Sequence, residues 1–183
     1  MKRIEMTLPG VCLIEPLVFE DERGFFFESY HEIKFAEIGI KDKFVQDNHA
    51  KSIKGTLRGL HYQISHPQAK LCRVIKGEVL DVVVDIRPES PHFAKWEAAI
   101  LSEENRRMMY VPPGFAHGYL VLSQTAEFLY KCSDFYRPEY ERGLAWNDPT
   151  IGIKWEIEIP ILSEKDRRNP LLSDIAPADL PKY

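Results

Sequence analysis

A period-2 pattern, typical of a β-strand, runs through Val79-Leu80-Asp81-Val82-Val83-Val84-Asp85-Ile86. The even-numbered positions are all apolar and would share one face, whereas Asp81 and Asp85 alternate with valines on the other. The preceding Lys76-Gly77-Glu78 is typical of a tight turn. We therefore expect residues 71–75 and 79–86 to form a β-hairpin.

The rest of the chain also consists mostly of short β-type runs separated by turn residues. Further runs of this kind cover residues 11–19, 24–29, 44–48, 96–101, 107–111, 118–122 and 127–132. About ten short strands at this spacing predict an all-β sandwich or barrel, and we favour the barrel.

Helical signals are few. Residues 31–38 fit helical spacing and Gly39 supplies a stop, so one helix is expected there. The segment after residue 138 is richer in proline and charge, which favours loops and short helical turns. Ser163 fits the N-cap of a turn over residues 163–168, with Asp166 at the third helical position.

Since no repeat or Gly/Ser linker divides the sequence, we expect one domain over residues 1–183.

The composition limits the partners and the compartment. Of the 183 residues 44% are hydrophobic, enough for a core, and the net charge of -4 does not favour nucleic acid. A phosphate-bearing ligand would need a local cluster of arginine and lysine. Cys12, Cys72 and Cys132 are odd in number and far apart, so buried free thiols are expected. Because neither a signal peptide nor a run of ~20 apolar residues is found, we expect a soluble cytoplasmic protein that does not enter a membrane.

Polar residues with catalytic potential are concentrated in Arg58-Gly59-Leu60-His61-Tyr62-Gln63, followed by Lys70 and by Pro112-Pro113-Gly114-Phe115-Ala116-His117. Simple alternation would place Arg58 and His61 on opposite faces of a strand. A bulge or twist is therefore needed if both side chains line one pocket.

A catalytic metal is disfavoured by the residue types at these positions. Zn²⁺ or Fe²⁺ would need three histidine or carboxylate ligands and an open position, as in metal-binding cupin barrels. Here His61 is followed by Gln63, and Lys70 stands where the carboxylate would be needed. A protonated lysine cannot ligate a cation, so only His117 remains. We expect proton chemistry by organic side chains, without a metal.

The same residues suit acid–base catalysis. A neutral histidine such as His61 is a natural general base near pH 7, and an aspartate would orient it best, although spacing leaves open which one. Lys70 would supply a positive charge for a developing oxyanion. The Tyr130 hydroxyl could transfer a proton, or the ring could simply be a half-buried aromatic. A phosphate-binding set can be drawn from Arg23, Arg58 and either Lys165 or Arg167.

Several motifs occur in the order found in a known enzyme family. They are Asp21-Glu22-Arg23-Gly24-Phe25-Phe26, Phe44-Val45-Gln46-Asp47-Asn48, residues 57–63, Gly114-Phe115-Ala116-His117-Gly118, Tyr130-Lys131-Cys132 and Ser163-Glu164-Lys165-Asp166. Through these motifs, which extend over nearly the whole chain, it resembles the dTDP-4-dehydrorhamnose 3,5-epimerases, the RmlC family of deoxysugar-nucleotide epimerases.

The resemblance implies a homodimeric, cupin-type β-barrel or jelly roll with a few short helices and no cofactor. Its substrate would be a dTDP-4-keto-6-deoxyhexose, inverted at C3 and C5 for L-rhamnose biosynthesis. By this resemblance His61 would be the base with Asp166 as its dyad partner, Lys70 would face the ketone oxygen, and Tyr130 would be the acid on the opposite face. Tyr136 would stack on thymine. The other implied binding residues are Arg23, Glu28, Gln46, Asp47, Asn48, Arg58, His117, Glu141 and Lys165.

Other functions stay open on the sequence. Relatives that epimerise one carbon or act as 3,4-ketoisomerases share much of this pattern, so the number of carbons inverted is not determined. A metal-dependent cupin oxygenase and a non-catalytic sugar- or nucleotide-binding module are the alternatives from other functional classes.

Overall fold

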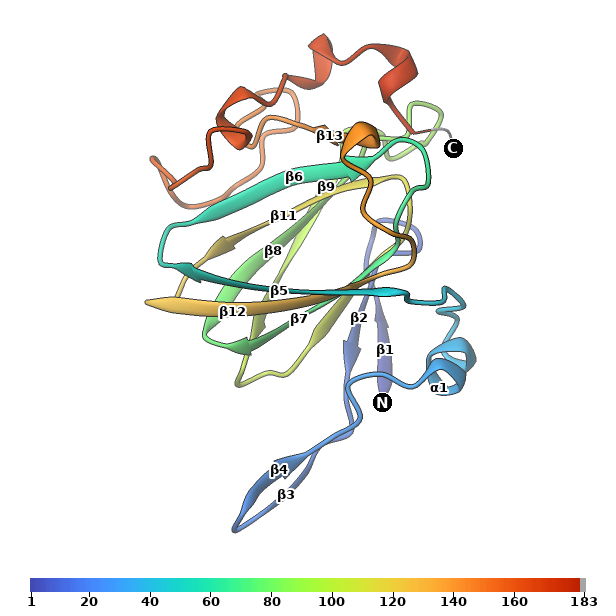
Figure 1. Ribbon diagram of the computed structural model, residues 1–183, viewed down its shortest axis with the longest axis vertical. Helices are drawn as coiled ribbons and strands as arrows, with labels where there is room; N and C mark the ends of the chain where they lie inside the picture. The colour runs from blue at the N-terminus through green and yellow to red at the C-terminus, as the bar shows by residue number, and fades with distance from the viewer. Residues whose placement is uncertain (182–183) are drawn as a thin grey trace.

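The computed structural model describes residues 1–181 and is built mainly from antiparallel β-strands (Figure 1). One sheet has the order β1 (Lys2–Glu5), β2 (Cys12–Glu15), β10 (Met108–Val111), β7 (Lys70–Lys76), β12 (Thr125–Cys132) and β5 (Gln46–Ile53). The second has the order β13 (Glu141–Gly143), β6 (Leu57–Gln63), β11 (Phe115–Val121), β8 (Glu78–Asp85) and β9 (Trp96–Ser102). The predicted all-β fold is confirmed, as two sheets packed in the manner of a jelly roll.

The apolar core lies between these two sheets, and smaller clusters cover their outer faces. Val74 on β7 and Phe128 on β12 pack against Val83 on β8 in the central cluster. Val82 and Val84, which alternate with Val83, pack outward in a second cluster. The period-2 pattern of this strand is thus confirmed, with both of its faces buried, and its inward face is the one that carries Asp81 and Asp85.

The predicted hairpin around Gly77 is wrong, because β7 and β8 belong to different sheets. Gly77 has a φ of +76°, and a Cβ added there would lie 2.1 Å from the carbonyl oxygen of Thr125. Its amide donates to Glu103 Oε1 at 2.6 Å. The tight turn exists, but it carries the chain across the sandwich instead of folding it back within one sheet.

Helix α1 (Glu32–Glu37) confirms the predicted helix and packs Phe35 against the outer face of the first sheet. From β13 to residue 181 the chain forms loops and short helical turns, as expected: η2 (Asp166–Arg168), η3 (Leu172–Asp174) and η4 (Pro177–Asp179), with η1 (Pro138–Tyr140) just before β13. No helix among the described residues is long and apolar enough to cross a membrane.

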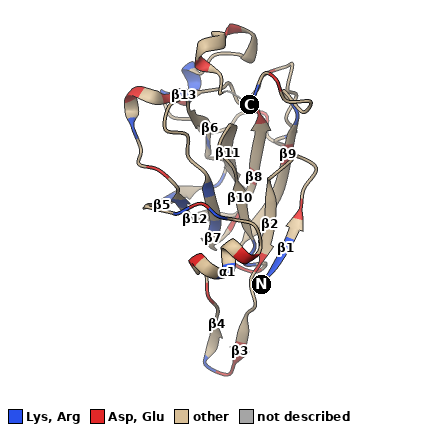
Figure 2. Cartoon of the chain, turned by 90° about the vertical axis from the view of Figure 1, so that its right-hand side faces the viewer, with Lys and Arg blue, Asp and Glu red and all other residues tan. Residues whose placement is uncertain are grey.

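A hairpin of β3 (Phe19–Asp21) and β4 (Gly24–Phe26) extends away from both sheets; we call residues 19–26 the arm. Figures 1 and 2 both show the arm projecting from the two sheets, and Figure 2 shows acidic and basic residues at its tip. Phe19, Phe25 and Phe26 are 60%, 58% and 68% exposed. Such exposure of large aromatic side chains is unusual on a surface without a partner.

Candidate active site

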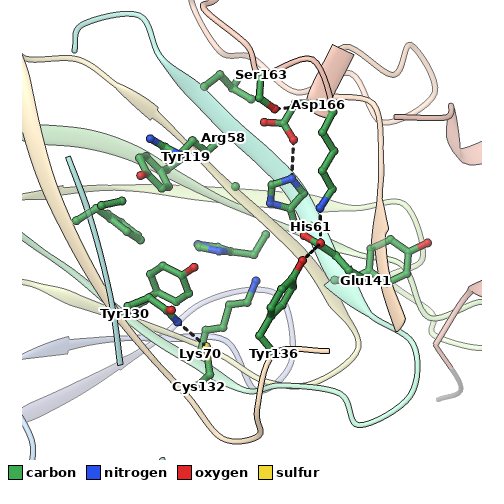
Figure 3. Close-up of a pocket in the computed structure, with 18 of the residues that line it drawn as sticks. Arg58, His61, Lys70, Tyr119, Tyr130, Cys132, Tyr136, Glu141, Ser163 and Asp166 are labelled. Carbon is green, nitrogen blue, oxygen red and sulfur yellow. Dashed lines mark hydrogen bonds and ion pairs between the residues drawn. The ribbon is translucent and has the colours of Figure 1, made fainter. Parts of the chain in front are cut away.

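A cavity of about 550 Å³ opens between the two sheets. Its walls come from β5, β6, β7, β11 and β12, and residues 161–166 close one side. Figure 3 shows polar side chains converging on this space from opposite walls. A cavity of this size with converging polar groups is suited to a small-molecule ligand.

The bulge that the sequence required is present where β6 pairs with β11. His61 lies opposite His117 and Arg58 opposite Tyr119, so two residues of β6 face Gly118 alone. Gly59 has a φ of +126°, and a Cβ added there would lie 2.7 Å from the Cα of Gly118. This close backbone approach requires glycine, and the extra residue brings both Arg58 and His61 to the cavity.

His61 and Asp166 form a dyad at one wall, with His61 Nε2 lying 2.6 Å from Asp166 Oδ1. The amide of Asp166 donates to Ser163 Oγ at 3.1 Å, the hydrogen bond expected of Ser163, but the turn itself is shorter than predicted and covers Asp166–Arg168 with Lys165 at its N-cap. Asp166 is only 4% exposed. Burial raises the pKa of its carboxyl, but hydrogen bonds from His61, Ser163 and the Gly59 amide outweigh burial and lower it. The carboxylate therefore stays ionised and can hold the imidazole in one orientation.

Lys70 on β7 and Tyr130 on β12 reach the cavity from the opposite side (Figure 3). Burial raises the pKa of Tyr130 well above its usual value, so the phenol keeps its proton. Next to them, Asn48 Nδ2 donates to Cys132 Sγ at 3.5 Å and accepts at Oδ1 from Gln46 at 3.1 Å. An ammonium and a phenol proton donor thus face the dyad across the cavity.

Tyr136, Glu141 and Lys165 form a linked group at another part of the cavity. The Tyr136 hydroxyl donates to Glu141 Oε2 at 2.5 Å, and the Lys165 ammonium donates to the same oxygen. This hydrogen bond raises the pKa of Tyr136 to about 12, so its phenol is neutral. Burial raises the pKa of Glu141, but the hydrogen bonds from Lys165 and Tyr136 prevail and lower it. The half-exposed Tyr136 ring is held at the cavity by these contacts.

Four of the residues singled out from the sequence lie elsewhere. Arg23 is on the arm and pairs with Asp21, Glu28 follows the arm and pairs with Lys34, Asp47 pairs with Lys131, and Arg167 pairs with Glu164. Asp47 points away because it alternates on β5 with Gln46 and Asn48, which line the cavity. Of the possible phosphate-binding cations, the structure brings Arg58 and Lys165 to the cavity.

The partner of His117 was not predicted from the sequence. His117 Nε2 lies 2.6 Å from Asp81 Oδ1, and both side chains are buried. The signal was an aspartate on an otherwise valine-rich strand face, since a buried carboxylate requires a partner. Cys72 joins this pair: ligand atoms of Cys72, Asp81 and His117 lie within 4.8 Å of one another. Of the positions considered as metal ligands from the sequence, only His117 belongs to this group. Gln63 instead accepts a hydrogen bond from the Arg137 amide at 3.0 Å and supports a loop.

Comparison with known proteins gives consistent matches over nearly the full chain. The family model for dTDP-4-dehydrorhamnose 3,5-epimerase matches residues 5–174. A protein of that name from Pseudomonas aeruginosa is 53% identical over 176 residues, covering 95% of this chain and 97% of its own.

Solved structures agree with these matches. An epimerase from Legionella pneumophila, in complex with dTDP-4-keto-L-rhamnose, superposes with a TM-score of 0.97 at 47% identity, covering 100% of this chain and 98% of its own. A 3′-monoepimerase from Streptomyces bikiniensis, in complex with dTDP-quinovose, reaches a TM-score of 0.89 at 34% identity, covering 97% and 92%.

Proposed function

The chain belongs to the dTDP-4-dehydrorhamnose 3,5-epimerase family, and we propose that it inverts C3 and C5 of dTDP-4-dehydro-6-deoxy-D-glucose to give dTDP-4-dehydro-L-rhamnose. The observation that carries this proposal is the His61–Asp166 dyad, which faces Lys70 and Tyr130 across one cavity of a cupin-like fold. Epimerisation beside a ketone needs a base, an oxyanion-stabilising group and an acid on the opposite face. These residues supply all three.

The reaction follows from the protonation states at the site. A C–H beside a ketone becomes removable when the enolate oxygen is stabilised, and the Lys70 ammonium is the group proposed to do this. His61, oriented by the ionised Asp166, takes the proton as general base. Tyr130, whose raised pKa keeps the phenol protonated, delivers a proton from the other face. Holding base and acid on facing walls keeps the two steps on opposite faces of the sugar.

We assign the nucleotide to the part of the cavity around Tyr136. Its half-exposed ring offers a flat surface on which thymine can stack. Arg58 and Lys165 supply positive charge for the diphosphate. The remaining polar groups proposed to bind the substrate are Gln46, Asn48, His117 and Glu141.

We infer further that the enzyme is a homodimer in which the arm of each copy enters the cavity of the other. Arg23 and Glu28 are expected binding residues, yet Arg23 lies on the arm, Glu28 follows it, and neither lines the cavity of its own chain. The exposed Phe25 and Phe26 would be covered by the second copy. A two-fold axis would place each arm in the cavity of the other copy in the same way.

The free thiols of the three cysteines support a reducing, cytoplasmic location for the enzyme.

The test is incubation with dTDP-4-dehydro-6-deoxy-D-glucose in D₂O, followed by NMR at C3 and C5. We expect deuterium at both carbons and an L-configured product. His61→Ala should lower both exchange rates by about two to four orders of magnitude, the usual effect of losing a general base. Near-normal exchange in that variant would exclude His61 as the base, and absence of exchange in the wild type would contradict the enzymatic assignment.

A single-carbon epimerase is the second candidate, favoured by the similarity to the 3′-monoepimerase at 34% identity. The same NMR experiment separates the two. Inversion at C3 alone, with C5 retained in the accumulated product, would select the monoepimerase.

A further inference from the structure

A second group of reactive side chains lies behind the cavity wall. Cys72 on β7, Asp81 on β8 and His117 on β11 come from both sheets and are all buried. His117 Nε2 lies 2.6 Å from Asp81 Oδ1 and 3.7 Å from Cys72 Sγ. Of the three, His117 lines the cavity, so an ion could reach the group from the substrate's side.

The group is not fully satisfied by its own hydrogen bonds. Asp81 is 0% exposed, and its Oδ2 has no hydrogen-bond partner among residues 1–181. An unpaired carboxylate oxygen in the interior is unfavourable and calls for a bound group. A thiol, a carboxylate and an imidazole together are the donor types that zinc prefers.

We propose that Cys72, Asp81 and His117 bind one Zn²⁺ ion at the base of the cavity, and that this ion inhibits the enzyme. Tetrahedral zinc with bonds of about 2.0–2.3 Å needs donor atoms about 3.3–3.6 Å apart. The sulfur–nitrogen separation of 3.7 Å already fits. The nitrogen–oxygen separation of 2.6 Å must open by about 0.7 Å, as the hydrogen bond gives way to two metal bonds. The fourth position is left for water.

The charges at the site balance when the ion enters. The Cys72 S–H bond breaks, a sulfur–zinc bond forms and the thiol proton leaves to solvent. His117 gives up the Nε2 proton that it shares with Asp81, takes a proton from solvent on Nδ1 and coordinates through Nε2, so the imidazole stays neutral. Bond formation with zinc drives the loss of the thiol proton. The thiolate and the Asp81 carboxylate then offset the ion's two charges. The nearby Lys70, which would repel a bare dication, therefore faces a neutral site.

The inhibition rests on the proposed function, whereas the binding does not. His117 is a proposed substrate-binding residue, and a zinc ion would hold its Nε2 and occupy space beside Lys70. Zinc should therefore raise the apparent KM for the sugar nucleotide more than it lowers kcat.

The binding test titrates the purified, metal-free full chain with Zn²⁺ and, in parallel, with Co²⁺. We expect one ion per chain and a near-ultraviolet cobalt–thiolate absorption band. Cys72→Ala should remove the band and weaken zinc binding by more than about 100-fold, since even second-shell losses weaken metal sites roughly 10–100-fold. Cys72→Val provides a second variant should the smaller side chain disturb folding. Cys12→Ala removes another buried thiol, remote from the cavity, and should leave both signals unchanged.

The outcomes separate the two proposals. Equal binding in the wild type and Cys72→Ala, or loss of the band in Cys132→Ala instead, would overturn the site. One zinc per chain without any effect on turnover would overturn the inhibition. If the wild type binds zinc through Cys72 but does not epimerise its substrate, the zinc site stands and the proposed function fails.

Discussion

Burial raises the pKa of both Asp166 and Tyr130, but the net pKa shifts of these two side chains are opposite. Asp166 is buried yet ionised, because three hydrogen-bond donors outweigh the loss of solvent and lower its pKa. Tyr130 is partly buried, and the loss of solvent around its hydroxyl raises its pKa. The cavity therefore presents a fixed anion behind the base and a neutral acid across from it, which is the distribution that opposite-face proton transfer requires.

Tyr130→Phe should separate exchange from inversion. The ring keeps its packing, and His61 and Lys70 stay in place, so deprotonation should continue. Without the hydroxyl the enolate regains a proton mainly from His61, on the original face. We expect deuterium uptake with little inverted product, measured by NMR and product stereochemistry in one sample. Full epimerisation would exclude Tyr130 as the acid, and loss of exchange would show that it also stabilises the enolate.

Asp166→Asn should destabilise the protein in a pH-dependent manner. The folded-state pKa of Asp166 lies below its unfolded value of about 3.9, so its ionisation stabilises the fold above that pH and ceases to do so as pH falls through the folded pKa. We expect a difference from wild type of about 1–3 kcal/mol near neutral pH. It should shrink below about pH 4. Denaturant unfolding between pH 7 and pH 3, at one protein concentration, measures this; a difference that grows on acidification contradicts it.

At the scale of strands, the sequence predicted where strands lie better than how they pair. Period-2 alternation reports which residues share a face, so the strand through Val82 and the run over residues 127–132 are both found as expected. Pairing depends on distant segments, which alternation does not describe. Gly77 looked like a hairpin turn, but its amide binds Glu103 and it connects two sheets. A glycine turn has the same residue preferences whether it closes a hairpin within one sheet or connects two sheets, so only the tertiary structure distinguishes these two kinds of turn.

The site was predictable where a local rule constrained it. Alternation alone showed that Arg58 and His61 could share a cavity only across a bulge, and the bulge is present. The hydrogen bond from the Asp166 amide to Ser163 likewise followed from residue spacing. The pairing of His61 with Asp166 joins residues 105 positions apart, and it came from family resemblance and not from spacing. The Asp81–His117 pair was missed for the same reason.

Gly59→Ala should test whether the bulge positions the dyad. Its Cβ would meet Gly118 at 2.7 Å with φ at +126°, so we expect a loss of about 1–3 kcal/mol in stability and a lower kcat. Gly24→Ala is a matched control for stability, since Gly24 has a φ of +131° and nothing within 4 Å of an added Cβ. Thermal unfolding of both variants separates backbone strain from the clash. Equal losses would show that the contact with Gly118 is unimportant.

In the molecule as a whole, the arm projects from the two sheets and leaves most of its aromatic surface exposed. Arg106 anchors the middle of the arm through an ion pair with Glu20 at 2.6 Å and lies over the Phe25 ring at 4.3 Å. Phe19 and Phe26, which pair at the base of the arm, remain exposed. Anchoring an exposed aromatic hairpin in one orientation reduces the entropy lost when it binds another surface. The geometry thus favours a second copy of the chain as the surface that receives it.

Mixing two inactive variants should therefore restore activity if the arm serves the other copy's cavity. His61→Ala disables the site of its own chain, and Arg23→Ala would disable the partner's site. In a mixed dimer one cavity then carries both defects and the other carries neither. Because half of randomly assembled dimers are mixed and each has one intact cavity of two, co-refolding equal amounts should recover about a quarter of wild-type activity below the wild-type KM. If Arg23 instead served its own chain, every cavity would keep a defect, and activity would stay at the average of the two variants.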